Sequence, residues 1–167
     1  MDRRTGIILV LAALAIGVAA VLGSAGGSSS VSETKDLAVK PVVPKQTGTA
    51  PTELKIDDVV KGTGAEAKSG DKATMRYVGV LYDGGEQFDA SWDRTPNSFP
   101  FTLGAGQVIK CWDQGVVGMK VGGRRQLTCP SDLAYGPQGS PPTIPADAPL
   151  VFVVDLTKVE PGTPAGK

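Results

Sequence analysis

The chain has 167 residues, with 17 basic and 17 acidic side chains and therefore no formal net charge. This length suits one domain of ordinary size with additional tails, and the balanced charge argues against a nucleic-acid-binding surface. The absence of histidine excludes catalytic triads and zinc sites built on imidazole, while 22 glycines and 13 prolines predict many turns and few long helices.

Residues 1–27 have the pattern of an export signal. Arg3 and Arg4 precede an apolar run from Ile7 to Leu22, and small residues follow the run. A basic start, a short apolar stretch and a small-residue exit are typical of bacterial-type secretory signals. The run has 16 residues, fewer than the ~20 that cross a bilayer comfortably as a helix. An uncleaved anchor over residues 7–22 stays open as an alternative, and in either case we expect an exported protein that is extracellular or located in the cell envelope.

Residues 28–51 are expected to form a flexible linker. The segment contains mainly serine, threonine, valine, lysine and proline, with no aromatic residue and no sustained periodicity. Pro41, Pro44 and Pro51 favour an extended backbone with few hydrogen bonds. We interpret the segment as a tether for the folded domain.

The folded domain is expected over residues 52–160, followed by a C-terminal tail at 161–167, because all aromatic residues lie within the former range. Short runs rich in β-branched and aromatic residues, bounded by turn residues, predict strands. The last run is apolar on both alternating faces, as in a strand at the centre of a covered sheet. The predicted strands are Leu54–Val60, Lys72–Tyr82, Gln87–Trp92, Phe99–Leu103, Arg124–Cys129 and Leu150–Val154.

One short helix is predicted within the stretch from Gly104 to Met119. Ile109, Trp112, Val116 and Met119 recur at spacings of three and four residues, which favours a helix with one buried face. A helix this short does not persist alone and must be held by packing. Five or six antiparallel strands and one short helix laid against them predict an α+β domain.

The segment from Ser131 to Pro149 is a long loop containing five prolines. A loop this long within a compact domain is usually functional. The alternative is a stiff, well-packed connection stabilised by its prolines.

The motifs of this domain resemble those of the FKBP-type peptidyl-prolyl cis-trans isomerases, the macrolide-binding immunophilins. The resemblance covers roughly residues 52–160, and six motifs occur in the family's order and spacing. It implies a twisted antiparallel sheet wrapped around the short helix, with the active site between them. The motifs are Tyr77-Val78-Gly79, Gly84–Ser91, Phe99–Gly104, Val108-Ile109 with Trp112, Leu133–Gly136, and Ile144-Pro145 with Leu150–Phe152.

The resemblance implies a pocket with aromatic walls. Trp112 would form the floor under a bound proline ring, and the walls would be Tyr77, Phe88, Phe99 and Phe152. Taken singly, each of these aromatic residues is more often an ordinary core residue. Their combination at the family's positions favours the pocket.

The polar groups of the pocket also follow from the resemblance. The backbone N–H of Ile109 would donate to one ligand carbonyl, and the hydroxyl of Tyr135 to another. Asp89 would lie at the pocket edge and pair with Arg94. Two further apolar residues would complete the rim: Val108 and, from the long loop, Ile144.

The implied activity is rotation about X–Pro peptide bonds, whose barrier is ~18–20 kcal/mol. No covalent bond changes, so no cofactor, metal or nucleophile is expected, and catalysis would arise from tighter binding of the twisted amide. Spontaneous isomerisation takes ~10–100 s and can limit folding. The expected partners are proline-containing peptides, unfolded or exported proteins, and macrolides such as rapamycin. No nucleic-acid partner is expected, and a membrane would be contacted only through an uncleaved N-terminal segment.

A second class of function stays open: a proline-recognising binding or chaperone module with little turnover. The near-complete aromatic set favours the isomerase. Two loop positions depart from the family pattern, because Ser140 and Thr143 are small and polar where histidine and an aliphatic residue are common. Trp92, at the strand edge after Asp89, is an uncommon aromatic residue that we expect to be exposed. A wider partner surface and simple covering of the loop both stay open as its role.

Cys111 and Cys129 are expected to form a disulfide. They are the two cysteines of the chain, and an exported protein favours their oxidation. The bond would join the short helix to the strand Arg124–Cys129 and would contribute roughly 3 kcal/mol in the chain-entropy model. Two buried free thiols remain the alternative at this point, because a sequence does not show whether the Cβ atoms meet.

Overall fold

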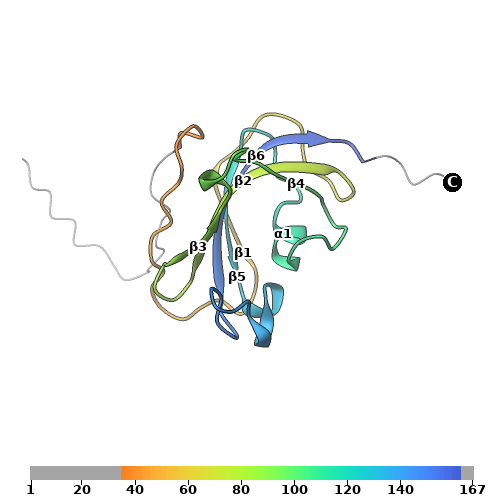
Figure 1. Cartoon of the computed structure of the whole chain (residues 1–167). Coiled ribbons are helices and arrows are strands. Elements are labelled where there is room, and N and C mark those ends of the chain that lie inside the picture. Colours follow the sequence, from red (N-terminus) through yellow and green to blue (C-terminus); the bar gives the residue numbers. More distant parts are fainter. Residues whose placement is uncertain (1–34, 163–167) are drawn as a thin grey trace, which may run out of the picture.

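Six antiparallel strands build a curved sheet around one short helix in the computed structural model, which describes residues 35–162 (Figure 1). The hydrogen-bonded order is β1-β5-β6-β2-β3, and β4 pairs with the first half of β2 while β3 pairs with its second half. The strands are β1 (Lys55–Val60), β2 (Lys72–Leu81), β3 (Gln87–Ala90), β4 (Phe99–Thr102), β5 (Arg124–Cys129) and β6 (Leu150–Glu160). The helices are α1 (Lys110–Gly115) and three 3-10 turns, η1 (Ser91–Asp93), η2 (Ser131–Leu133) and η3 (Gly136–Gln138). The predicted α+β class is confirmed.

The long strands β2 and β6 form the centre of the sheet. They pair from Lys72 opposite Glu160 to Leu81 opposite Leu150, and successive side chains point to opposite faces. The inner face, toward α1, carries the larger core cluster, which includes Met75, Phe101, Leu127, Phe152 and Leu156. The outer face carries a second cluster, which includes Val78, Val80, Val151 and Val153. The prediction of a central strand covered on both faces is confirmed for β6.

Two strand boundaries differ from the prediction by more than one residue. β6 continues to Glu160 rather than ending at Val154, because the next residue, Asp155, is neutralised in the sheet by Arg124 through Oδ1–Nε and Oδ2–Nη2 contacts of 2.6 and 2.8 Å. β3 ends at Ala90, and Trp92 lies in the turn η1 rather than in a strand.

Residues 35–51, which we name the N-terminal strap, lie in the range predicted to be a flexible linker. The strap runs along the outer face of the sheet, on the side opposite α1 (Figure 1). Its contacts include a buried valine, Val43, and hydrogen bonds from Arg76 and Arg124 to its carbonyls. A tether free of the domain is therefore not what the structure shows for this part of the chain. Local sequence patterns do not reveal these contacts, because their partners lie on strands far along the chain.

The predicted export signal at residues 1–27 and the tail beyond residue 162 lie outside the described residues. Within residues 35–162, no helix combines the length and apolar character that a membrane span requires.

The predicted disulfide is confirmed. Cys111 in α1 and Cys129 at the end of β5 are bonded, with Cα atoms 5.8 Å apart, and both side chains are fully buried. The bond fixes α1 to the inner face of the sheet at the point where the chain enters the segment 131–149. That segment contains the turns η2 and η3 rather than being an irregular loop throughout.

Candidate functional site

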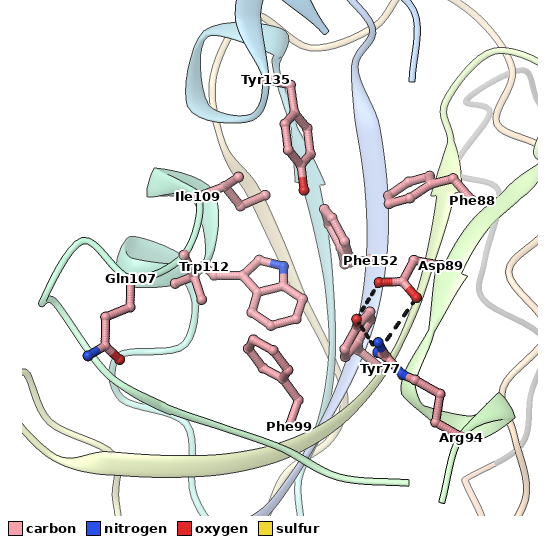
Figure 2. Close-up of a pocket in the computed structure, with 11 residues that line it drawn as sticks. Tyr77, Phe88, Asp89, Arg94, Phe99, Gln107, Ile109, Trp112, Tyr135 and Phe152 are labelled. Carbon is pink, nitrogen blue, oxygen red and sulfur yellow. Dashed lines mark hydrogen bonds and ion pairs between the residues drawn. The ribbon is translucent and has the colours of Figure 1, made fainter. Parts of the chain in front are cut away.

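A cavity of about 270 Å³ lies between α1 and the inner face of the sheet (Figure 2). Ten of the eleven predicted site residues line it, although they come from segments up to 75 positions apart (Tyr77 to Phe152). The lining residues are Tyr77, Phe88, Asp89, Arg94, Phe99, Gln107, Val108, Ile109, Trp112, Tyr135 and Phe152. The sheet, the helix and the segment 131–149 each contribute part of the wall.

Trp112 lies at the centre of the aromatic cluster. Its ring makes edge-on contacts with Tyr77, Phe99 and Phe152, at centroid distances of 4.9, 5.8 and 5.3 Å. Such T-shaped pairs are the favoured geometry for aromatic rings and hold each ring in place. The indole N–H is buried and has no hydrogen-bond partner among the described residues. Packing therefore orients this ring, and the floor of the cavity is rigid and apolar.

Gly79 makes room for two of the walls. A Cβ atom at this position of β2 would lie 2.7 Å from Cζ of Phe88 and 2.8 Å from Cε1 of Phe152. Both distances are far below van der Waals contact, so a side chain here would displace the rings. The rings of Phe88 and Phe152 instead meet edge-on at 5.5 Å.

The turn before α1 is fixed by its own side chains. Asp113 accepts hydrogen bonds from the backbone N–H groups of Gly104 and Gly106, at 2.8 and 3.0 Å. Both glycines have positive φ, 77° and 69°, a region that side chains with a Cβ rarely adopt. Gln107 closes the turn by accepting from the N–H of Thr102 at 2.9 Å. The turn thereby places Ile109 at the N-cap of α1.

The backbone of Ile109 presents a donor at the cavity rim. Its carbonyl accepts from the N–H groups of Trp112 and Asp113, at 3.0 and 3.3 Å. Its own N–H has no protein acceptor in the part of the chain that the structure describes. Because the first N–H groups of a helix lack partners within it, this N–H is available to a carbonyl of a bound molecule.

Tyr77, Asp89 and Arg94 form a hydrogen-bonded network at one edge of the cavity (Figure 2). The Tyr77 hydroxyl donates to Oδ2 of Asp89 and accepts from Nη2 of Arg94, both at 2.5 Å. Arg94 Nη2 also lies 3.6 Å from Oδ1 of Asp89, which is the predicted ion pair. Burial, with the hydrogen bond to Asp89 as a further cause, raises the pKa of Tyr77 to about 12. The phenol is therefore neutral and acts as a fixed link between the two charges.

Tyr135 extends its hydroxyl toward the cavity from the opposite side (Figure 2). No hydrogen-bond partner of this hydroxyl occurs within residues 35–162. Burial raises its pKa, and the charge of Asp89 adds to the rise. The group is thus a neutral donor that a ligand carbonyl can occupy.

The cavity wall differs from the prediction at two residues. Ile144 was expected to line the pocket, but it is buried in the core cluster and is absent from the cavity wall. The tight turn Ser140–Ile144, closed by backbone hydrogen bonds of 2.8 and 2.9 Å, directs it inward. Gln107 was missed as a lining residue. It lies in the stretch from Gly104 to Met119 that contains the predicted helix, but an uncharged polar residue in a turn does not by itself indicate a binding site.

The residues that line the site can support few kinds of chemistry. The cavity holds no pair of nucleophile and base, and within residues 35–162 no three cysteine, aspartate or glutamate side chains are placed to share a metal ion. It offers an aromatic chamber with an apolar floor, two hydrogen-bond donors without a protein partner among residues 35–162, and one fixed carboxylate. Such a site binds and orients a compact apolar group flanked by carbonyls.

Comparison with known proteins gives a consistent result. Residues 64–157 match the family model of the FKBP-type peptidyl-prolyl cis-trans isomerases. The chain is 50% identical over 122 residues to the FK506-binding protein of Streptomyces anulatus, which covers 72% of this chain and 97% of that protein. It is 47% identical over 118 residues to the probable FK506-binding protein of Corynebacterium glutamicum, covering 70% of this chain and 96% of that protein. The crystal structure of AtFKBP13 superposes with a TM-score of 0.59 at 36% identity, over 65% of this chain and 94% of that one.

Proposed function

Since the chain belongs to the FKBP-type peptidyl-prolyl cis-trans isomerases, we propose that the cavity around Trp112 is where it binds an X–Pro bond and favours its twisted state. The chain is a peptidyl-prolyl cis-trans isomerase by this membership. The observation that carries the assignment of the site is the edge-on packing of three aromatic rings around Trp112, which gives a cavity of about 270 Å³ an apolar floor. A proline ring is an apolar group of suitable size for such a chamber.

The aromatic walls favour the transition state by their low polarity. A planar amide is stabilised by resonance that separates charge, and the barrier of ~18–20 kcal/mol reflects its loss on twisting. Water solvates the polar planar form better than the less polar twisted form. A chamber lined by Trp112, Phe99 and Phe152 removes that advantage, so the twisted amide binds relatively more tightly. Each 1.36 kcal/mol of such differential binding increases the rate about tenfold.

The two donors hold the peptide on either side of the rotating bond. The N–H of Ile109 binds one flanking carbonyl, and the hydroxyl of Tyr135 binds another. Because both donors are fixed before the substrate arrives, no reorganisation is needed during rotation. The network of Tyr77, Asp89 and Arg94 holds the aromatic wall and keeps a carboxylate at the cavity edge.

The substrates we propose are proline-containing segments of unfolded proteins. The names of the bacterial relatives include FK506, and macrolides of that class, such as rapamycin, are proposed to occupy the same cavity. The polar Thr143 and Ser140, both exposed on the 131–149 segment, reduce the apolar area that such a large ligand would cover. A weaker affinity than that of a chain with an aliphatic residue at position 143 follows from this reduction.

We further propose that the protein acts outside the cytoplasm, assisting the folding of exported proteins. The arginines and apolar run of residues 3–22 support export, and the disulfide between Cys111 and Cys129 suits an oxidising compartment. Cell fractionation with an antibody to the domain tests the location. Recovery of the protein in the cytoplasm, with both thiols free to alkylation, would contradict it.

An isomerase assay tests the proposed site. The purified chain should accelerate cis-to-trans conversion of a short Ala-Leu-Pro-Phe peptide, measured by a coupled protease or by NMR exchange. Saturating rapamycin should abolish the acceleration, and should protect Trp112 from fluorescence quenching by acrylamide. If rapamycin binds while peptide turnover is absent, the binding-module alternative holds instead. If turnover persists with the cavity saturated, the site lies elsewhere.

A further inference from the structure

The N-terminal strap crosses the outer face of the sheet instead of pairing with an edge. Its own backbone bond joins the Val39 N–H to the Asp36 carbonyl at 3.2 Å, and among the described residues no backbone bond joins the strap to a strand. A paired strand would add a ladder of such bonds. The sheet therefore binds the strap through its own side chains and not by backbone strand pairing.

Two arginines on the outer face hold the strap backbone. Arg124, Asp155 and Arg76 face one another across β5, β6 and β2, and this row carries two guanidinium groups for one buried carboxylate. Both guanidinium groups also donate hydrogen bonds to the strap. Nη2 of Arg76 donates to the Leu37 carbonyl at 2.6 Å, and Nη2 of Arg124 donates to the Val39 carbonyl at 3.0 Å.

The two arginine contacts lie at a turn at the start of the strap. Residues 37 and 38 form this turn, which the bond from the Val39 N–H to the Asp36 carbonyl closes. After the turn, residues 40–47 form no further turn, and the burial of their side chains alternates as it does along an extended chain. Pro41 and Val43 are buried, whereas Val42 between them is 65% exposed.

The apolar part of the outer face packs closely against this segment. Val43 packs into the outer cluster with Val80, Tyr82 and Val153. The backbone of Lys45 passes so close to Gly85 that a Cβ there would lie 3.0 Å from the Lys45 Cα. The Tyr82 hydroxyl donates to the Thr49 carbonyl at 3.2 Å and fixes the far end.

We propose that the outer face of the sheet is a second peptide-binding site, specific for a turn followed by a segment with proline or an aliphatic residue at alternate positions, and that residues 37–50 occupy it in cis. Arg76 and Arg124 bind two carbonyls of the turn region, Val43 packs into the outer cluster, and Pro41 is buried two residues before it. The site lies on the face of the sheet opposite the isomerase cavity. The two sites can therefore be filled at the same time.

A cleavable strap tests the proposal in the full chain. A tobacco etch virus protease sequence is inserted between Pro51 and Thr52, where the chain is accessible, and the strap fragment is followed by gel filtration after cleavage. We expect the fragment to co-elute with the domain and to exchange for a fluorescein-labelled peptide of residues 35–51. Saturating rapamycin should leave this exchange unchanged.

Two neighbouring residues supply the matched control. A Val43→Asp peptide should bind at least tenfold more weakly than the wild-type peptide, because it places a charge in the apolar cluster. A Val42→Asp peptide should bind within twofold of the wild type, because Val42 faces solvent. Arg76→Met in the full chain should weaken the binding of all three peptides.

The proposal would be overturned if the fragment separated at once from the domain, the domain kept full isomerase activity, and the labelled peptide did not bind. Equal binding by the Val42→Asp and Val43→Asp peptides would also overturn it. If the cleaved domain aggregates, urea unfolding of the uncut chains decides. A loss of stability in Val43→Asp alone supports docking of the strap, and equal stability of the two variants contradicts it.

Discussion

The indole ring of Trp112 is oriented by the rings around it and not by a side-chain hydrogen bond. Its indole N–H is buried without a partner among the described residues, and Tyr77 packs on it at 4.9 Å. The polar groups of the site are instead confined to the rim, where Ile109 and Tyr135 both line the cavity. This separation of an apolar floor from a polar rim is what the binding of a proline ring between two carbonyls requires.

Tyr135→Phe should lower kcat/KM for an X–Pro peptide by about three- to tenfold, because one net hydrogen bond contributes about 0.5–1.5 kcal/mol. The hydroxyl has no protein partner to lose within residues 35–162, so the free energy of unfolding should stay the same. Peptide assays and urea unfolding of the same preparation measure both quantities. A loss of stability that matches the loss of activity would show that the hydroxyl has a structural role instead.

Tyr77 predicts a stability change at alkaline pH. Its pKa is about 12 in the folded chain, above the ordinary value near 10 in the unfolded chain, so the folded state holds the phenol proton more tightly. This contribution to stability is fully present below pH 10 and is lost as the pH rises toward and through 12. Urea unfolding from pH 9 to 11.5 should show the decline in the wild type.

The Tyr77→Phe variant is the control for this titration. It lacks the phenol hydroxyl, so the part of the stability decline that belongs to Tyr77 should disappear. In a pH titration followed by absorbance at 295 nm, the tyrosine that ionises at the highest pH should also be missing. If the wild type and the variant decline in parallel, the raised pKa does not belong to Tyr77.

The helix α1 has six residues, too few to persist without packing. Cys111 attaches it to β5, and Asp113 ties it to the preceding turn through Gly104 and Gly106. The disulfide therefore stabilises the element that carries the cavity floor.

Replacing both cysteines by alanine should lower the free energy of unfolding by about 3 kcal/mol, as expected for a closed loop of this size in the chain-entropy model. Urea unfolding followed by tryptophan fluorescence gives the value. The reduced wild type is the matched control and should unfold close to the variant. An unchanged midpoint in the double variant would mean that the bond adds nothing to the stability.

Gly79→Ala should impair the walls of the cavity through β2. The added Cβ would lie 2.7 Å from the Phe88 ring, and overpacking of this kind costs about 1–3 kcal/mol. We expect both lower stability and at least a tenfold lower kcat/KM. Val80→Ala, which removes atoms from the outer face of the same strand, should lower stability while leaving kcat/KM unchanged. An equal loss of activity in both variants would refute the role of this glycine in shaping the cavity.

Much of the fold could be predicted from the sequence because most elements of the sheet follow a local period. β5 matches its prediction at both ends, and β1, β2 and β4 differ by one residue. The end of β6 could not be predicted from hydrophobicity. Its continuation depends on Asp155, whose charge is compensated by Arg124, 31 positions earlier in the chain.

The candidate site was predictable for a different reason. Single aromatic residues do not distinguish a pocket from a core, and it was the ordered set of motifs that placed ten residues around one cavity. Ile144 and Gln107 were misjudged because the direction of a side chain in a turn depends on local backbone geometry. The strap was missed because a proline-rich segment has the same composition whether it is free or docked on a sheet through Pro41 and Val43.

The molecule as a whole has two tryptophans, and they lie on opposite faces of the sheet. Trp112 faces the cavity, whereas Trp92 packs on the outer face, with the guanidinium carbon of Arg76 4.2 Å from its ring centroid. Replacing each by phenylalanine makes the same chemical change at a proposed site and at a control position.

The rate of X–Pro isomerisation by these two variants tests whether the cavity is the active site. Trp112→Phe should lower kcat/KM by about three- to tenfold, because the smaller ring leaves part of the floor uncovered, and Trp92→Phe should stay within twofold of the wild type. If both variants keep the wild-type rate, or if Trp92→Phe loses as much as Trp112→Phe, the cavity around Trp112 is not where the bond rotates.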